Sequence, residues 1–149
     1  AMKTRISCRA KLEKPQPRQV EDTPKGKMLI AHPLDVDAAL CRIEPGKLAT
    51  TEELRRSLAA SFGANYTCPL TTGIFSHMTA EAAEEDLARG IEEITPYWRL
   101  VRPDGSLNEK FPGGVEHQAT RLREEGHTIE AGRGSTLRVK DFRAFLQEM

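Results

Sequence analysis

The spacing of apolar residues from position 28 onward predicts a series of short helices, separated by glycines and prolines. Residues 32–43 (HPLDVDAALCRI) place Pro33 at a first helical position. Residues 49–63 (ATTEELRRSLAASFG) carry Thr50 and Glu53 in the spacing of a capping box and end at Gly63. The apolar positions at helical spacing are Val36, Leu40 and Ile43 in the first segment and Leu54, Leu58 and Phe62 in the second. Both segments are therefore expected to be helices.

A third helix is predicted from Pro69 to Gly90, and a fourth over residues 115–126. The residues expected to be buried are Leu70, Ile74, Phe75, Met78 and Ala82 in the third helix and Val115, Ala119 and Leu122 in the fourth. The second and third helices with their connecting loop are compatible with a helix-turn-helix.

Residues 95–107 (TPYWRLVRPDGSL) predict two short strands around a Pro-Asp-Gly turn, a β-hairpin in the position of a wing. Residues 127–139 predict an extended piece with a glycine loop, and residues 141–149 predict a short amphipathic segment. The expected fold class is mostly α with a small β-hairpin, a winged helix-turn-helix-like module.

Composition and charge divide the chain into a tail and one domain. The 149 residues suffice for a single domain with a real core. The net charge is zero, but residues 1–27 hold eight Lys/Arg against three acids, which leaves residues 28–149 with a net charge of −5. We expect residues 1–27 to be a basic, flexible tail and residues 28–149 to be the folded domain. The tail is either a nucleic-acid-binding arm or a disordered leader.

Several classes of chemistry find no support in the sequence. No apolar run approaches the roughly 18 residues of a membrane helix, and the first residues given do not show the charged-then-apolar pattern expected of a signal peptide. Three cysteines without CxxC spacing indicate reduced thiols rather than a disulfide framework or a zinc site, and the glycine-rich stretches lack a phosphate-loop pattern. We expect a cytoplasmic monomer with no metal, no cofactor and no membrane contact.

The order of several short motifs adds a family resemblance. The segments PGKLATTEEL, TPYWRLVRPDGSL, the glycine pair of PGG and LREEGH together resemble the C-terminal DNA-binding, active-site domain of the O6-alkylguanine-DNA alkyltransferase family, over roughly Leu29 to His127. The resemblance implies a helix-turn-helix that flips an alkylated guanine out of the duplex. In that family a cysteine thiolate takes the alkyl group, helped by a histidine that a buried glutamate orients through a water.

The family's reactive positions are mostly replaced in this chain. Under the resemblance, Tyr97 occupies the place of the cysteine and Trp98 that of the histidine, whereas Pro96, Arg99 and Glu125 match the family. Because a phenol with a pKa of about 10 is a poor alkyl acceptor at neutral pH, alkyl transfer at this position is not expected. The resemblance is therefore to the alkyltransferase-like members, which bind alkylated guanine in DNA repair without transferring the alkyl group.

These five residues form the predicted base pocket. The two adjacent rings either stack on a flipped base or pack the predicted hairpin onto the helices, and the sequence leaves both interpretations open.

The predicted DNA contacts also depart from the family. Thr51 stands where the family has a tyrosine that helps rotate the nucleotide, and Thr71 or Thr72 stands where it has an arginine that fills the vacated stack. Arg99 and Arg102 complete the predicted contacts to double-stranded DNA.

Three further hypotheses remain open for the function. A repair protein could be a partner of the DNA-bound chain. The domain could instead be a protein-interaction or small-molecule-binding module that has lost DNA binding. Alternatively, Cys68 could be a relocated alkyl acceptor, because it precedes a predicted helix N-terminus, where the helix dipole lowers a thiol pKa.

Overall fold

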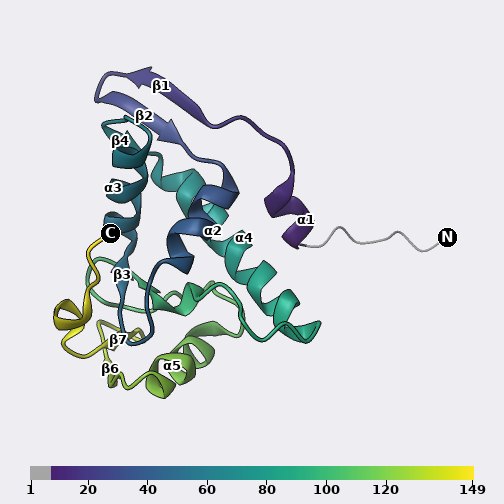
Figure 1. The fold of residues 1–149 in the computed structure, drawn as a ribbon. Coiled ribbons are helices and arrows are strands. Elements are labelled where there is room, and N and C mark those ends of the chain that lie inside the picture. Colours follow the sequence, from purple (N-terminus) through teal and green to yellow (C-terminus); the bar gives the residue numbers. More distant parts are fainter. Residues whose placement is uncertain (1–7) are drawn as a thin grey trace.

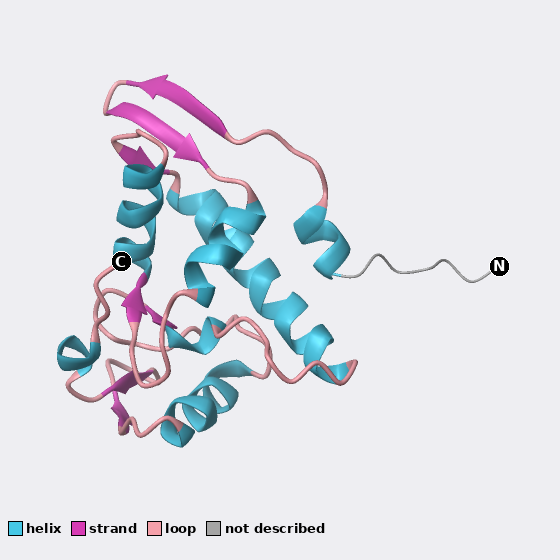
Figure 2. Ribbon diagram, in the orientation of Figure 1, coloured by secondary structure: helices cyan, strands magenta, loops and turns pink. Residues whose placement is uncertain are grey.

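The computed structural model describes residues 8–149, which form five helices and three small sheets (Figures 1 and 2). The helices agree with the predicted α-rich fold class, whereas the sequence predicted one β-hairpin rather than three sheets. The helices are α1 (Cys8–Glu13), α2 (Pro33–Cys41), α3 (Thr51–Ser61), α4 (Pro69–Ala88) and α5 (Gly114–Glu124). The strands are β1 (Gln19–Thr23), β2 (Gly26–Ile30), β3 (Ala49–Thr50), β4 (Tyr66–Thr67), β5 (Leu100–Val101), β6 (Ile129–Ala131) and β7 (Leu137–Val139). Two 3₁₀ turns are η1 (Tyr97–Arg99) and η2 (Phe142–Phe145).

Local caps explain where two of the predicted helices begin. The Thr50 hydroxyl accepts a hydrogen bond from the backbone N–H of Glu53 at 3.1 Å, which starts α3 at the predicted position. The reciprocal capping box forms instead at α2: His32 Nδ1 accepts from the backbone N–H of Leu34, and the Asp35 carboxylate accepts from the backbone N–H of His32.

The segment expected to be a flexible tail is folded onto the domain from residue 8 onward; residues 1–7 of that prediction lie outside the described residues. Helix α1 packs on α4, its Leu12 is fully buried, and Arg9 pairs with Asp86 at 2.7 Å. Strand β1 then pairs antiparallel with β2, so the predicted boundary at residues 27/28 falls inside a strand. The burial of Leu12 and the pairing of β1 with β2 hold this segment on the domain. Neither interaction is indicated by the charge pattern of the segment.

Residues 95–107 do not form the predicted hairpin. Residues 97–99 are the turn η1, and β5 pairs in parallel with β3, through Ala49 with Leu100. The chain does turn at the Pro-Asp-Gly sequence, but afterwards Leu107 donates its N–H to Leu137 of β7, at 2.9 Å. The residues after the turn therefore pair with β7 rather than with β5. The antiparallel hairpins of the described residues are β1–β2 and β6–β7, at opposite ends of the molecule (Figure 1).

The buried face of α4 also differs from the prediction. Leu70 is 71% exposed and Ile74 50% exposed, while Phe75 and Met78 are partly buried and Ala82 is buried. The residues of α4 that face the protein are mostly small: Thr72, Ser76, Thr79, Ala80, Ala82, Ala83 and Asp86. Small side chains let α4 lie close to α1, α2 and η1, and this close packing outweighs the stripe of larger residues.

Candidate functional site

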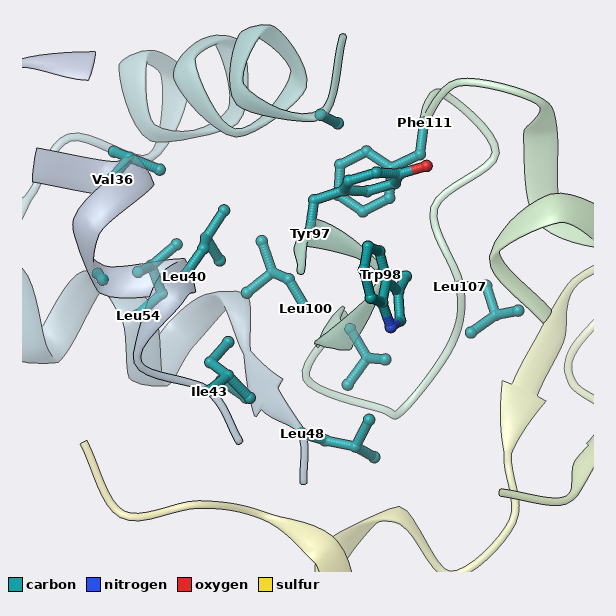
Figure 3. Packing of buried hydrophobic residues seen from close by; sticks show 14 of the residues in the cluster. Val36, Leu40, Ile43, Leu48, Leu54, Tyr97, Trp98, Leu100, Leu107 and Phe111 are labelled. Atoms are coloured by element: carbon teal, nitrogen blue, oxygen red, sulfur yellow. The ribbon is translucent and has the colours of Figure 1, made fainter. Parts of the chain in front are cut away.

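Tyr97, at the position of the family nucleophile, lies in the hydrophobic core. Its ring is fully buried and packs edge-on against Phe111 and Trp98, with ring centroids 5.3 and 5.5 Å apart (Figure 3). Its hydroxyl donates a hydrogen bond to the Glu84 carboxylate of α4. Burial, and then the Glu84 carboxylate, raise the pKa of Tyr97 far above its usual value. The phenol is therefore a neutral hydrogen-bond donor.

The Glu84 carboxylate contacts three polar side chains. Besides Tyr97, its Oε1 contacts His117 Nε2 at 3.1 Å and accepts from the Arg121 guanidinium at 2.8 Å. Burial raises the pKa of Glu84, but these partners outweigh burial and the net pKa is lowered. The carboxylate is thus held ionised and ties α4 to η1 and α5.

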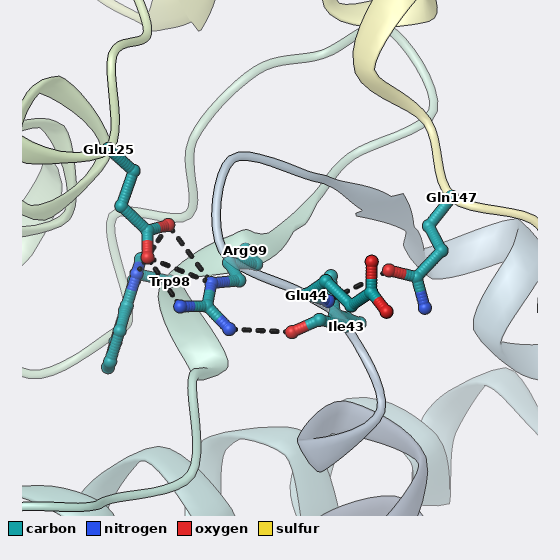
Figure 4. Close-up of polar contacts among 6 residues, drawn as sticks. All are labelled: Ile43, Glu44, Trp98, Arg99, Glu125 and Gln147. Atoms are coloured by element: carbon teal, nitrogen blue, oxygen red, sulfur yellow. Dashed lines mark hydrogen bonds and ion pairs between the residues drawn. The ribbon is translucent and has the colours of Figure 1, made fainter.

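Trp98, Arg99 and Glu125 form a second cluster (Figure 4). The Trp98 Nε1–H donates to Glu125 Oε1 at 3.2 Å, and Arg99 binds the same carboxylate through Nε and Nη2. Arg99 Nη1 also donates to the Ile43 carbonyl at 2.6 Å. Burial raises the pKa of Glu125, whereas the Arg99 hydrogen bonds and charge lower it, and the net pKa is lowered. An indole N–H can donate but cannot take up a proton, so Trp98 keeps a contact to the glutamate without being a base.

The residues of the predicted base pocket therefore mostly contact other residues of the protein itself. Pro96 is buried, Trp98 is 8% exposed, and Arg99 is held in the buried ion pair with Glu125. A groove of about 710 Å³ does reach Pro96, Trp98 and Arg99, and the Arg121 guanidinium covers the Trp98 ring at 4.6 Å. Tyr97 and Glu125 do not line this groove.

A different cavity, of about 380 Å³, lies between α3, the first turns of α4 and residues 100–111. Three of the predicted DNA-binding residues line it: Thr51, Thr72 and Arg102. Thr71 does not line it, and Arg99 lies in the Glu125 cluster. The Thr72 hydroxyl is buried and donates to the Cys68 carbonyl at 2.7 Å, so it belongs to the cavity wall.

This cavity is also lined by Arg55, Ser76, Leu100, Val101, Asn108 and Phe111. The sequence did not single out Ser76, Asn108 or Phe111. Phe111 joins the cavity to the core, since its ring also packs on Tyr97. Within residues 8–149, the Arg55 guanidinium has no hydrogen bond or ion pair, whereas Arg102 pairs with Glu109 at 2.9 Å. Only the loop sequence around NEKFPGG could have indicated Asn108 and Phe111.

A single buried side chain holds two walls of the cavity. Gln118 of α5 is fully buried, and its amide N–H₂ donates to the Trp98 and Leu100 carbonyls, at 3.1 Å each. Its amide oxygen accepts from the backbone N–H of Asn108 at 2.9 Å. Strand β5 and the loop at Asn108 are thereby fixed to α5.

Cys68, the alternative acceptor, precedes α4 at its N-cap and is a partly buried free thiol. Burial raises the pKa of Cys68, but hydrogen bonding by Thr71 and Leu70 at the helix N-terminus outweighs burial, so the net pKa is lowered. Residues 8–149 hold no cluster of three His, Cys, Asp or Glu side chains that could bind a metal. No helix in the same range is long and apolar enough to span a bilayer.

Comparison with known proteins identifies the fold. No family model matches the sequence, and no curated protein sequence matches it. The fold, however, is that of the alkyltransferase-like proteins, which confirms the resemblance that the sequence motifs indicate.

Two crystal structures from S. pombe are similar to this chain: Atl1 in complex with damaged DNA containing O6-carboxymethylguanine, and ATL in complex with DNA. For each, the TM-score is 0.58 and the sequence identity 19%, over 78% of this chain and 94% of the S. pombe chain.

Proposed function

We propose that this protein binds double-stranded DNA through α3 and α4 and receives a flipped, alkylated or unusual guanine in the 380 Å³ cavity, without transferring the alkyl group. The observation that carries the proposal is the cavity itself, at the junction of two consecutive helices. Its volume lies in the range of about 300–1,000 Å³ that is usual for small-molecule sites. DNA binding by this fold is supported by the two similar S. pombe structures, both of which are complexes with DNA.

The lining of the cavity suits a base. Phe111, Leu100 and Val101 offer apolar surface to a ring, and the remaining wall carries hydroxyl, amide and guanidinium groups. A flipped base is recognised by this combination of apolar contact and hydrogen bonds to its edge. The two cavity arginines, Arg55 and Arg102, are the groups that we expect to contact phosphates.

The charge along α4 is compatible with this orientation. The cavity involves Pro69 to Ser76, in the first half of the helix, and a helix N-terminus favours phosphate. The acidic residues of α4 are Glu81, Glu84, Glu85 and Asp86, all in its second half. Glu84 and Asp86 are moreover paired with arginines of the protein itself.

The absence of alkyl transfer is inferred from the two clusters behind the cavity. The raised pKa of Tyr97 keeps its phenol neutral, and a neutral phenol is a weak nucleophile. Trp98 cannot take a proton from it. Glu125, which would orient a histidine in the family, forms an ion pair with Arg99.

The test is a fluorescence-anisotropy titration of one duplex with and without an O6-alkylguanine, at low and moderate salt. Arg55→Ala is the informative variant, and Arg56→Ala is its matched control, because Arg56 is exposed on the same helix and pairs with Glu52 and Glu53. We expect tighter binding to the lesion. Arg55→Ala should weaken binding and reduce the salt slope by about 1, whereas Arg56→Ala should bind like the wild type.

Two results would contradict the proposal. Absence of binding to either duplex at low salt would favour a protein- or small-molecule-binding module on this fold. Mass spectrometry after incubation with the lesion duplex should find unmodified protein. An alkyl adduct on Cys68 would instead make that thiol an acceptor.

A further inference from the structure

The C-terminal segment is basic, although the domain to which it belongs is acidic. Residues 133–143 hold four Lys/Arg side chains against one acid, whereas residues 28–149 as a whole have a net charge of −5. Lys140 and Arg143 are exposed, and within residues 8–149 neither of them forms an ion pair. Clustered cations without a counter-charge of their own are typical of a surface that binds phosphates.

A groove of about 530 Å³ runs along β7 and η2 beside these cations. Its cationic side chains are Arg138, Lys140 and Arg143, and its acids are Glu130 and Asp141. Arg138 lies 3.1 Å from the Glu130 carboxylate, so these two charges compensate each other. The groove therefore keeps a net positive charge, which Lys140 and Arg143 supply.

The guanidinium of Arg143 is positioned by the Phe142 ring. It lies 4.8 Å from the ring centroid, and Phe142 itself is only 3% exposed. The Pro-Asp-Gly turn packs on the same ring: a Cβ added at Gly105, where φ is +83°, would meet Phe142 Cδ1 at 2.4 Å. Because the turn and the guanidinium share one buried ring, Arg143 has a defined place beside the turn.

This turn connects the basic segment to one wall of the proposed base cavity. Val139 of β7 donates its N–H to the Gly105 carbonyl at 3.0 Å, which pairs β7 with the turn. Arg102, three residues before Gly105, lines the cavity. Lys140 follows Val139 directly, so the first cation of the patch comes immediately after this attachment.

The other end of the basic segment is attached near the opposite wall of the cavity. Leu48 donates its N–H to the Phe145 carbonyl at 2.9 Å, and Figure 1 shows the C-terminal segment beside β3. Thr51, three residues after Leu48, lines the cavity at the start of α3. Since three extended residues span at most about 10 Å, the patch lies within roughly 20 Å, or about six base pairs, of a nucleotide held in the cavity.

We infer that Lys140 and Arg143 bind the phosphate backbone of the duplex a few base pairs from the nucleotide that enters the cavity. This inference rests on the proposed function and adds a second contact surface, outside α3 and α4, to the DNA interface. Phosphate contacts position a protein on the duplex but carry no sequence information. The patch should therefore strengthen binding to damaged and undamaged DNA alike, while the cavity supplies the preference for the lesion.

The test is the salt dependence of binding, measured by fluorescence anisotropy for one duplex with and without an O6-alkylguanine. The double variant Lys140→Gln/Arg143→Gln removes both charges and keeps polar side chains with aliphatic stems. For both duplexes, the slope of log Kobs against log salt should become shallower by about 1.8, because each lost phosphate contact removes about 0.9. The ratio of the two Kd values should stay unchanged.

Lys11→Gln/Arg89→Gln is the matched control, because it changes the net charge by the same amount. Lys11 and Arg89 are also exposed and form no ion pair within residues 8–149. Arg89 caps the C-terminus of α4, about 30 Å along the helix from Pro69, which lines the cavity. The control should bind both duplexes with the wild-type salt slope. Thermal melting of both double variants should stay close to that of the wild type, because all the replaced side chains are exposed.

The outcomes separate this contact from the proposed function. If Lys140→Gln/Arg143→Gln keeps the wild-type slope, or the control loses as much, the phosphate contact is refuted, while weaker binding by Arg55→Ala leaves the proposed function standing. A changed ratio of the two Kd values would also refute it, because the patch would then read the lesion. If the wild type binds phosphatidylserine vesicles but neither duplex, the patch serves a membrane surface and both proposals are refuted.

Discussion

Replacing Glu125 by Gln should destabilise this protein strongly, because the change leaves a buried guanidinium without its counter-charge. The carboxylate accepts from Trp98 Nε1 and from two nitrogens of Arg99, and the two side chains of the ion pair are only 10% and 15% exposed. Arg99 would keep its hydrogen bond to the Ile43 carbonyl. A glutamine at position 125, however, has one acceptor oxygen in place of the two carboxylate oxygens, and its N–H₂ group would face the N–H donors of Arg99 or Trp98.

The expected cost is about 3 kcal/mol, at the lower end of the range for breaking a buried ion pair, since some solvent reaches both groups. For a domain of this size, that corresponds to a fall in melting temperature of roughly 6–12 °C. The pKa of Glu125 is lowered in the folded state, so its contribution is present above the unfolded pKa of about 4.3 and is lost as the pH falls through the folded value. The difference between wild type and variant should therefore shrink in acid.

Urea denaturation of the wild type, Glu125→Gln and the double variant Arg99→Met/Glu125→Gln, at neutral and acidic pH, measures this cost. The double variant should recover part of the stability, because it removes the unpaired charge as well. A loss below about 1 kcal/mol for Glu125→Gln at neutral pH would refute the argument, since that is the value of an exposed pair.

Three other predictions concern the core and the N-terminal segment. Burial lowers the pKa of His127, so the stability of the wild type should fall as the pH drops below about 6.5. In His127→Phe the melting temperature should depend less on pH in this range. The same pH dependence in both proteins would contradict this prediction. Tyr97→Phe should cost about 1.5–3 kcal/mol in urea denaturation, the range for a hydrogen bond to a charged acceptor, because Glu84 loses one donor; no loss would show that this bond contributes nothing. Leu12→Ala should lower the free energy of unfolding by about 2–5 kcal/mol and speed proteolysis near α1. Lys11→Ala, at the exposed neighbouring position, should change neither. Equal behaviour of the two variants would mean that α1 does not pack on α4.

Local signals predicted the helices well. The starts of α2 at Pro33 and of α3 after Thr50, and the end of α5 before Gly126, depend on the conformational preferences of residues at those positions. The turn at the Pro-Asp-Gly sequence is another local feature, and it is confirmed.

Pairings between distant segments could not be predicted in the same way. Strand β5 pairs with β3, which lies about fifty residues earlier in the chain, and nothing in the sequence around Leu100 specifies this partner. The folding of residues 8–23 onto α4 and β2 was likewise hidden by their basic composition. On α4, helical spacing ranked Leu70 and Ile74 above the small residues, but the neighbouring elements need close approach and select the small face.

For the candidate site, the motif placed Tyr97, Trp98 and Glu125 next to one another, and the structure joins them through ring packing and the Trp98–Glu125 hydrogen bond. The cavity was only partly predictable. Thr51 and Thr72 came from the family pattern, and Arg102 was one of the arginines expected to contact DNA. Asn108 and Phe111 belong to a loop that is held by Gln118 of α5, and no local sequence signal indicates this contact.

The three hydrogen bonds of Gln118 bear on how fast a ligand could bind. Because one buried amide fixes both β5 and the loop at Asn108, these walls are preorganised, and association would not incur the entropic cost of ordering them. Complex formation should then approach a rate set by diffusion and electrostatic attraction rather than by a slow conformational step. The Asn108 amide proton, which donates to the buried Gln118 side chain, should exchange with solvent more slowly than the amide protons of the exposed residues next to it.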